Sequence, residues 1–520
     1  MIRSTSSITM NFTLWLSVFL AATVDAGTYE TIQGRSCFRS MKGMMDSMLD
    51  LAADSPNLMT ITDIGDSYLK NHDGRHDGVH DIPDGGYDIY ALNITASDSG
   101  RQSNEKGKML VTSGVHAREW APPELLARFI EMLVHGYDDN ADITWILQHT
   151  EIHAILYVNP DGRFMAEKYP ELYWRKNLNP IRCGGGYEYG VDINRNFDFA
   201  WGDQSGASSH PCAGDYHGPT AESEPETQAF ADYAKKLFPE EQRKSNPLEQ
   251  TNESFGESNT GMYIDIHSSG GYIYYPWGHK DAKSPDDEAL QALGRKINSF
   301  NNYKLWAGSQ PDFLYEASGD TSDWAYGVLG VASLGFEIGD DFQQECDSFE
   351  EEVVPQNLPA LLFAAKTAQK PFSTIKGPDV LEMSVRHVNG EIRVSAHASD
   401  SKMVNAITGS DAINNFPDFP TGDQSIKKVQ LYIDVHPDDY TEGDVSWEMQ
   451  SVDNALDSEE ETVGIVLPAN TFSPGRHMLF AQATDSDDYK GPVTSVFVEV
   501  STRETSRHAA SLRGSRAPSP

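Results

Sequence analysis

The sequence predicts an α/β domain, a sheet with helices on both faces, followed by a smaller β-sandwich. Between residues 29 and 368, apolar strand-like runs alternate with helix-like stretches, which is typical of an α/β sheet. After residue 378, short runs of alternating apolar and polar residues are typical of an immunoglobulin-like β-sandwich. A chain of 520 residues is also too long for one ordinary core, so at least two domains are expected.

The α/β region contains amphipathic helical stretches and short apolar runs in turn. Helices are expected over residues 40–52, 123–134, 224–237 and 288–300, and strands over 109–114, 152–158 and 262–267. In open α/β sheets the ligand site lies beyond the carboxyl ends of the strands. His116, His267 and Glu337 each follow or close an apolar run, so these three side chains are expected at the site.

The remaining segments complete the predicted organisation. The sandwich strands are expected over residues 391–397, 428–435, 462–467, 476–483 and 494–500. We expect a signal peptide over residues 1–26, a catalytic domain over 27–372, a linker over 373–378, an accessory sandwich over 379–500 and a disordered tail over 501–520. The sandwich and tail contain no convincing catalytic constellation, so an accessory role in stability or binding is expected.

The N-terminus predicts export. Arg3 precedes an apolar stretch over residues 12–24, and small residues suited to signal peptidase follow. A membrane-spanning helix needs about 20 apolar residues, so this stretch is interpreted as a signal peptide and the protein as secreted. Asn93 and Asn252 are glycosylation acceptors if the host secretes through an endoplasmic reticulum. A formal net charge of -38 argues against nucleic acid or an anionic membrane as a partner.

The chain has four cysteines, Cys37, Cys183, Cys212 and Cys346. An even number in an exported chain favours disulfides, with three possible pairings. Four buried free thiols are the alternative. A zinc-cysteine site is less favoured because no C-x2-C spacing occurs.

The motif His116-Ala-Arg-Glu119 places two metal-binding side chains directly after an apolar strand-like run. A second histidine, His267, closes another such run. Together these residues would form the His2Glu set of a catalytic zinc site, with the fourth position open to water. His-x-x-Glu alone is a weak signal, since a polar pair at the start of a helix gives the same pattern.

Four further segments make the case stronger: Tyr173-Trp-Arg175-Lys, Val191-Asp192-Ile-Asn194-Arg195-Asn, the run 315–324 and Leu334-Gly-Phe-Glu337-Ile. With them, residues 27–371 resemble a zinc metallocarboxypeptidase of the carboxypeptidase A type. The resemblance implies a mixed central sheet, one Zn2+ per catalytic domain, and peptide or protein substrates with a free C-terminus. It also implies a Cys183–Cys212 disulfide, which leaves Cys37 to pair with Cys346.

The resemblance also implies roles for individual residues. Glu337 matches the general base, Arg175 the oxyanion-stabilising cation, and Asp192 the acceptor that orients His116. Other matching positions bind the substrate: Arg118 in the outer subsites, Asn194 and Arg195 at the terminal carboxylate, and Tyr315 closing over it. The family often carries an arginine three positions before Arg175, where this chain has Leu172.

The same resemblance outlines the pocket for the last side chain of the substrate. Its expected lining is Gly278, Gln310, Ala317, Asp320, Thr321, Ser322 and Gly335. Ser322 fits neither the strictly basic nor the strictly apolar class. Asp320 could place a carboxylate near a basic side chain, and Gly278 with Gly335 would leave room for an aromatic ring, so broad specificity is predicted. The alternative is that Asp320 points to solvent.

Two other classes of function remain open at this point. One is a zinc amidase of the same superfamily, acting on cell-wall peptides or on N-acyl amino acids. The other is a non-catalytic binding protein that retains the fold.

Overall fold

The computed structural model describes residues 29–72, 85–181, 183, 189–203, 206–238, 254–307, 316–400 and 424–501. The expected signal peptide, Gln310, Tyr315, Asn252 and residues 502–520 lie outside the described part of the chain.

An eight-stranded mixed sheet forms the centre of the α/β region, in the order β3-β4-β6-β5-β7-β10-β8-β9. Strands β6, β5, β7 and β10 run parallel to one another, β8 and β9 run parallel to each other, and the pairs β3–β4, β4–β6 and β10–β8 are antiparallel. The strand bounds are β3 Met59–Asp66, β4 Asp88–Ile94, β5 Gly107–Ser113, β6 Thr150–Ile155, β7 Met262–His267, β8 Tyr272–Tyr275, β9 Lys304–Ala307 and β10 Ala332–Glu337. The predicted mixed α/β fold is therefore confirmed.

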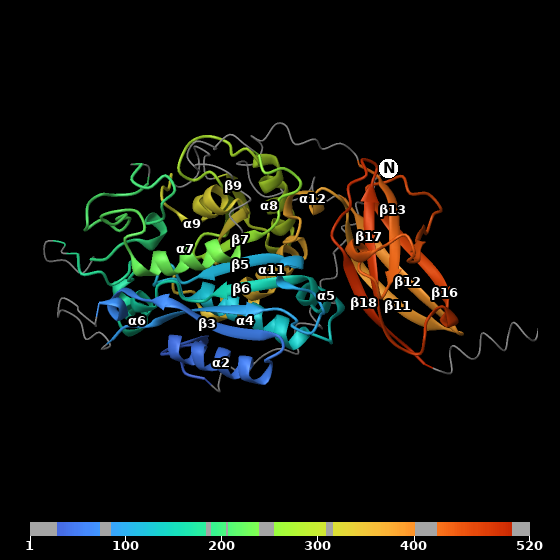
Figure 1. Cartoon of the computed structure of the whole chain (residues 1–520), viewed down its shortest axis with the longest axis horizontal. Helices are drawn as coiled ribbons and strands as arrows, with labels where there is room; N and C mark the ends of the chain where they lie inside the picture. Colours follow the sequence, from blue (N-terminus) through green and yellow to red (C-terminus); the bar gives the residue numbers. More distant parts are fainter. Residues whose placement is uncertain are drawn as a thin grey trace, which may run out of the picture.

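Helices cover both faces of this sheet. In Figure 1, α2 and α4 lie below the strands and α7 lies above them. The helix bounds are α2 Met41–Asp54, α3 Tyr68–Asn71, α4 Ala121–Gly136, α5 Ala141–His149, α6 Pro160–Lys168, α7 Pro225–Leu237, α8 Asp287–Asn301, α9 Thr321–Trp324, α10 Cys346–Ser348, α11 Val354–Thr367 and α12 Pro371–Thr374.

Local sequence explains where the main helices begin. The Ser40 side chain accepts a hydrogen bond from Gly43 N at the start of α2, and Asn159 does the same for Gly162 N at the start of α6. Proline occupies the first turn of α4, where its missing N–H costs no helical hydrogen bond. The middle strands β6 and β7 are buried along their whole length, as expected for parallel strands covered on both faces.

The second region is a β-sandwich of two antiparallel four-stranded sheets. Their orders are β11-β12-β16-β15 and β14-β13-β17-β18. The bounds are β11 Asp379–Val388, β12 Glu391–Ser399, β13 Ile426–Ile433, β14 Ser446–Glu448, β15 Gln450–Ser451, β16 Glu460–Pro468, β17 Gly475–Asp485 and β18 Thr494–Val500. Alternate residues of the strands, such as Ile392 and Val394 of β12 and Val429 and Leu431 of β13, form its own apolar core. Four of the five alternating runs of the sequence lie within these strands, and the run 428–435 extends two residues past the end of β13.

The two regions pack directly against each other. Tyr432, Phe480 and Val493 of the sandwich belong to the apolar core of the α/β region. The carboxylate of Asp142 on α5 accepts hydrogen bonds from Lys366 Nζ at 2.6 Å and from Ser495 N at 2.8 Å. Figure 1 shows α5 at the boundary, beside β18.

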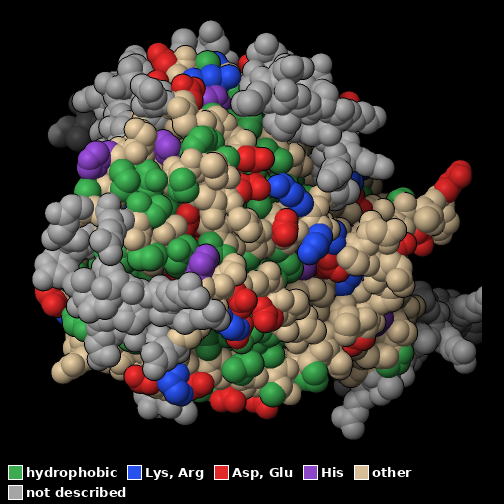
Figure 2. Space-filling view, turned by 60° about the vertical axis from the view of Figure 1, so that its left-hand side comes forward, with side chains coloured by type: hydrophobic (Ala, Val, Ile, Leu, Met, Phe, Trp, Pro, Cys, Tyr) green, Lys and Arg blue, Asp and Glu red, His purple; other side chains and the backbone are tan. Residues whose placement is uncertain are grey.

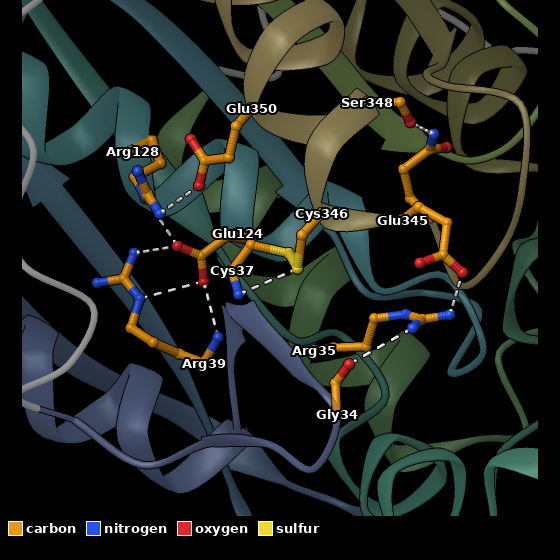
Figure 3. Close-up of a disulfide and its surroundings, with 11 residues drawn as sticks. Gly34, Arg35, Cys37, Arg39, Glu124, Arg128, Glu345, Cys346, Ser348 and Glu350 are labelled. Carbon is orange, nitrogen blue, oxygen red and sulfur yellow. Dashed lines mark hydrogen bonds and ion pairs between the residues drawn. A yellow bond between two sulfur atoms is a disulfide. The ribbon is translucent and has the colours of Figure 1, made fainter.

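A disulfide between Cys37 and Cys346 joins the beginning and end of the α/β region (Figure 3). Cys37 lies on β2 (Arg35–Arg39), which pairs with β1 (Thr31–Ile32). Beside it, the buried Arg39 donates to both carboxylate oxygens of Glu124 on α4, at 2.8 and 3.1 Å, and also pairs with Glu131. The second disulfide, Cys183–Cys212, is also present. Both pairings are those implied by the resemblance.

The surface mixes charges of both signs. Figure 2 shows acidic and basic side chains next to one another across the middle of one face, with apolar side chains around them. Asn93 lies within β4 between β3 and β6 and is partly exposed. Among the described helices, none has the length and apolar character needed to cross a bilayer.

Candidate metal centre and active site

The candidate residues meet at one edge of the sheet because three neighbouring parallel strands end there. Glu337, the last residue of β10, is in register with His267, the last residue of β7. Ser113, the last residue of β5, pairs with Ile266, and the following loop carries His116 and Glu119 before α4 begins. The carboxyl-end location predicted for the site therefore follows from the strand order.

His116, Glu119 and His267 form a buried group whose ligand atoms lie within 4.8 Å of one another. His116 Nδ1 lies 2.8 Å from Glu119 Oε1, and His267 Nδ1 lies 3.1 Å from Glu119 Oε2. All three residues are at most 5% exposed. Two imidazoles and one carboxylate that converge in this way could hold a metal ion.

The outer nitrogen of each histidine contacts a buried aspartate. His116 Nε2 lies 3.2 Å from Asp192 Oδ1, and His267 Nε2 lies 2.9 Å from Asp265 Oδ2. Carboxylates in these positions hold the Nε2 proton and leave both Nδ1 atoms as acceptors for a metal. This donor set and its outer partners fit Zn2+.

Asp265 was not identified from the sequence, although a signal was present. It lies two residues before His267 on β7, and alternate residues of a strand share one face. The hydroxyls of Thr112 and Thr321 donate to Asp265 at 2.8 and 2.5 Å. The carboxylate is thus held on three sides, which fixes the orientation of the His267 ring.

Contacts among the candidate metal ligands and their neighbours shift the pKa values of Glu119 and His267. Burial alone would raise the pKa of Glu119, but His116 and His267 hold it below its usual range. Burial would lower the pKa of His267, but Asp265 and Glu119 raise it well above its usual value. The Glu119 carboxylate and the His267 ring therefore stabilise each other's charged forms.

Arg175 is connected to His116 through Asp192. Its Nε and Nη2 atoms donate to Asp192 Oδ2 at 3.1 and 2.8 Å. Burial acts to raise the pKa of Asp192, but Arg175 and His116 hold it well below its usual range. The guanidinium is thus a fixed, partly exposed positive charge beside the candidate metal centre.

Glu337 is the candidate acid–base residue. It is only partly exposed, and removal of its carboxyl from water raises its pKa to about 8, with His267 opposing this shift and Glu119 adding to it. A carboxyl with a pKa near neutrality is suited to proton transfer.

Asn194 and Arg195 lie in the short helical turn η4 (Ile193–Arg195), next to His267. The Asn194 amide nitrogen is 3.4 Å from His267 Nε2, and its oxygen accepts from Thr321 N at 2.9 Å. Arg195 is buried and donates to the Gly206 and Asn194 carbonyl oxygens, each at 2.6 Å. Arg118 lies between His116 and Glu119, with its guanidinium 3.9 Å from the centre of the Phe342 ring.

Asp320 points inward, so the alternative of a solvent-facing side chain is excluded. It is 5% exposed, and its Oδ1 caps α9 by accepting from Ser322 N and Asp323 N at 2.9 and 3.0 Å. Its Oδ2 has no hydrogen-bond partner among the described residues and lies 3.6 Å from where a Cβ on Gly278 would be. The buried hydroxyl of Ser322 likewise has no such partner in the described structure.

One expectation about this pocket is wrong. Gly335 was expected to leave room for an aromatic ring, but the Tyr274 ring already fills that space. A Cβ placed on Gly335 would lie only 2.0 to 2.4 Å from atoms of this ring. The reason is that β8 pairs with β10 and aligns Tyr274 opposite Gly335. The Tyr274 ring thus lies directly beside the expected pocket position Gly335, a contact that sequence reasoning missed.

Comparisons with known proteins agree with this geometry. The family described as Zinc carboxypeptidase, Peptidase_M14, matches residues 44–356. Human carboxypeptidase A1 is 29% identical over 324 residues, which cover 62% of this chain and 65% of that protein. The chain thus spans just under two thirds of this relative's length.

Solved structures show the same fold. The structure of thrombin activatable fibrinolysis inhibitor superposes with a TM-score of 0.52 at 23% identity, covering 68% of this chain and 80% of that one. Carboxypeptidase A from Helicoverpa armigera gives a TM-score of 0.50 at 22% identity, with the same coverages of 68% and 80%. With more than half of its length matched by the family pattern, the chain belongs to the zinc carboxypeptidase family, Peptidase_M14.

Proposed function

We propose that this protein is an exported, zinc-dependent carboxypeptidase that removes the last residue of peptides and proteins. The observation that carries the proposal is the buried His116–Glu119–His267 group with Glu337 in register beside it. Family membership supports the same activity. The two disulfides support export, since disulfides persist in oxidising compartments.

We assign one Zn2+ per catalytic domain to His116 Nδ1, His267 Nδ1 and the Glu119 carboxylate. Zinc supplies Lewis acidity in such sites and lowers the pKa of water, so that a nucleophile exists at neutral pH. Asp192 and Asp265 orient the two imidazoles.

Glu337 moves the protons in the proposed reaction. As a carboxylate it takes a proton from the attacking water, and as the acid it gives that proton to the leaving amine. Burial raises the pKa of Glu337 to about 8 in the metal-free site, and a carboxyl whose pKa lies near neutrality can both accept and donate a proton. Arg175, held by Asp192, provides the positive charge for the oxyanion that develops at the carbonyl.

Selection of the chain end is assigned to four residues. Asn194 and Arg195 lie beside His267 and would bind the terminal carboxylate, where a guanidinium can form two parallel hydrogen bonds. Arg118 would contact the outer part of the substrate. Tyr315, by resemblance, would close over the bound end.

For the last side chain we propose broad specificity. The inward Oδ2 of Asp320 would receive a Lys or Arg side chain, with the Ser322 hydroxyl nearby as a neutral polar contact. Apolar ends would pack on the Tyr274 ring. Because this ring fills the space over Gly335, large aromatic ends require it to move.

A pair of matched peptides tests the activity. The zinc-loaded protein is incubated with one peptide that has a free C-terminus and with the same peptide amidated there. We expect release of the last residue from the free peptide only. Equal cleavage of both peptides, or cleavage only of a cell-wall peptide, would contradict the proposal and favour an amidase.

A further inference from the structure

A second pair of buried histidines lies at the boundary between the α/β region and the sandwich. His149 is the last residue of α5, and His436 follows β13 in the sandwich. They are 7% and 6% exposed, and their ring centres are 4.2 Å apart with the planes tilted by 44°. Asp439, the last residue of the turn η8 (Pro437–Asp439), lies beside them.

This pair reproduces the geometry of the catalytic pair. The rings of His116 and His267 have centres 4.7 Å apart and a tilt of 40°. In the group of His149, His436 and Asp439, as in the catalytic group, the ligand atoms lie within 4.8 Å of one another. Two imidazoles and one carboxylate thus converge at a second place, from two different regions of the chain.

The hydrogen bonding at this place is incomplete. His436 Nε2 is buried and has no hydrogen-bond partner among the described residues. His149 Nε2 lies 3.8 Å from Asp439 Oδ2, which is too long for a hydrogen bond. A buried ring nitrogen without a partner is costly and needs an explanation, which a bound cation would provide.

The surroundings suit a bound cation. Trp145 and Phe480 flank the His436 ring with centres 4.9 and 5.4 Å away and provide an apolar shell. Asp439 is 43% exposed in its side chain, which leaves a route from solvent. Arg101 pairs with Asp439, as an outer partner commonly does with a ligating carboxylate.

We propose that His149, His436 and Asp439 bind a second Zn2+, which clamps the sandwich to the α/β region. Two imidazoles and a carboxylate are a common zinc set, and the fourth position would face solvent on the side of Asp439. Because the ligands come from both regions, the bound ion stabilises their contact.

The protonation of the ligands agrees with this assignment. Burial lowers the pKa of His149 to about 3, with His436 adding to the shift, and burial lowers the pKa of His436 to about 4. Both rings are therefore neutral near pH 7, the form that binds metals. His436 Nδ1 accepts from Asp438 N at 3.2 Å, so binding through Nε2 moves the ring proton to Nδ1 and gives up this long contact.

Zinc counting on the full chain tests the proposal. The protein is stripped with a chelator, dialysed against buffered Zn2+ and analysed for bound metal. We expect two equivalents in the wild type, one in His436→Gln, one in His267→Ala and none in the double variant. His387→Ala, which removes an exposed histidine of the sandwich, is the matched control and should keep two.

Thermal unfolding gives a second readout on the same proteins. In His267→Ala, added Zn2+ should raise the unfolding midpoint, and this rise should disappear in His267→Ala with Asp439→Asn. The Asp439 side chain is 43% exposed, so this variant is expected to fold. Two results would overturn the second site. The first is a wild type that binds one equivalent of zinc and loses it in His267→Ala. The second is a zinc count in His436→Gln that equals the wild-type count. If only the proposed catalytic site fails to bind zinc, His436→Gln should still lower the zinc count by one.

Discussion

Glu337 and His267 are direct neighbours, in register on the parallel strands β10 and β7. The sheet itself therefore fixes the distance between the proposed proton-transfer residue and a proposed zinc ligand. Their backbones cannot separate without breaking the ladder of a buried strand pair.

Replacing Glu337 by Gln should separate catalysis from metal binding. The amide keeps the shape of the side chain but cannot shuttle a proton, so turnover should fall about 100- to 10,000-fold. Bound zinc should stay at the wild-type level, whereas His267→Ala should lose zinc as well as activity. Peptide hydrolysis and metal analysis on the same samples provide the check, and near-normal turnover in the Gln variant would refute the assignment.

Replacing Asp265 by Asn should weaken metal binding without removing a ligand. The amide cannot hold the Nε2 proton of His267 as a carboxylate does, and loss of such outer partners typically costs about 10- to 100-fold in metal affinity. Chelator competition measures this change. Asp63→Asn, an exposed change on β3, is the control, and equal zinc affinity in both variants would show that Asp265 has no positioning role.

Removing the Cys37–Cys346 disulfide should destabilise the protein strongly. It closes a sequence separation of 309 residues, and removal of a native disulfide typically costs about 2 to 5 kcal/mol. The double serine variant is compared with the wild type by denaturant unfolding. Loss of Cys183–Cys212, with a separation of 29, should cost less, so the reverse order would contradict the loop-length argument.

The titration of Glu226 should lower the free energy of unfolding as the pH rises. Burial raises its pKa to about 8, with Asp161 and Glu224 adding to the shift. Since an unfolded Glu titrates near pH ~4.3, the folded protein binds more protons than the unfolded chain between these values. The free energy of unfolding therefore decreases as the pH rises through this window.

The variant Glu226→Gln tests this relationship by removing the titrating group. Relative to the wild type, it should become steadily more stable between about pH 5 and about pH 9. Denaturant unfolding at several pH values gives the difference. A difference that does not depend on pH would show that Glu226 titrates normally in the folded protein.

Asp320→Asn should reduce cleavage before basic residues. The amide still caps α9, so the fold is kept, but the attraction to a Lys or Arg side chain is lost. Hydrogen bonds to charged groups contribute about 1.5 to 3 kcal/mol, which corresponds to roughly 10- to 100-fold in kcat/KM. Peptides ending in Lys, Arg, Leu and Phe are compared, with the apolar ends as the internal control. If basic ends are not cleaved by the wild type, or are cleaved equally by the variant, Asp320 does not contribute to specificity.

Much of the fold followed from local pattern. The alternating runs between residues 391 and 500 form sandwich strands. Their apolar residues recur at every second position, so they lie on one face of each strand, and that face is buried in the core. The amino-acid sequence alone was enough to group His116, Glu119, His267 and Glu337, since each closes or follows an apolar strand-like run and the family motifs mark the same positions.

Other features depended on which side chains meet across elements. The spacing of two residues between Asp265 and His267 can be seen in the sequence. The contact of the Tyr274 ring with Gly335 cannot, because it depends on the antiparallel pairing of β8 with β10. The contact of His149 with His436 joins residues 287 positions apart in two regions, and no sequence pattern connects them. Periodicity and motifs are local properties that the chain itself carries, whereas strand order and domain contact arise only when distant apolar surfaces are buried together.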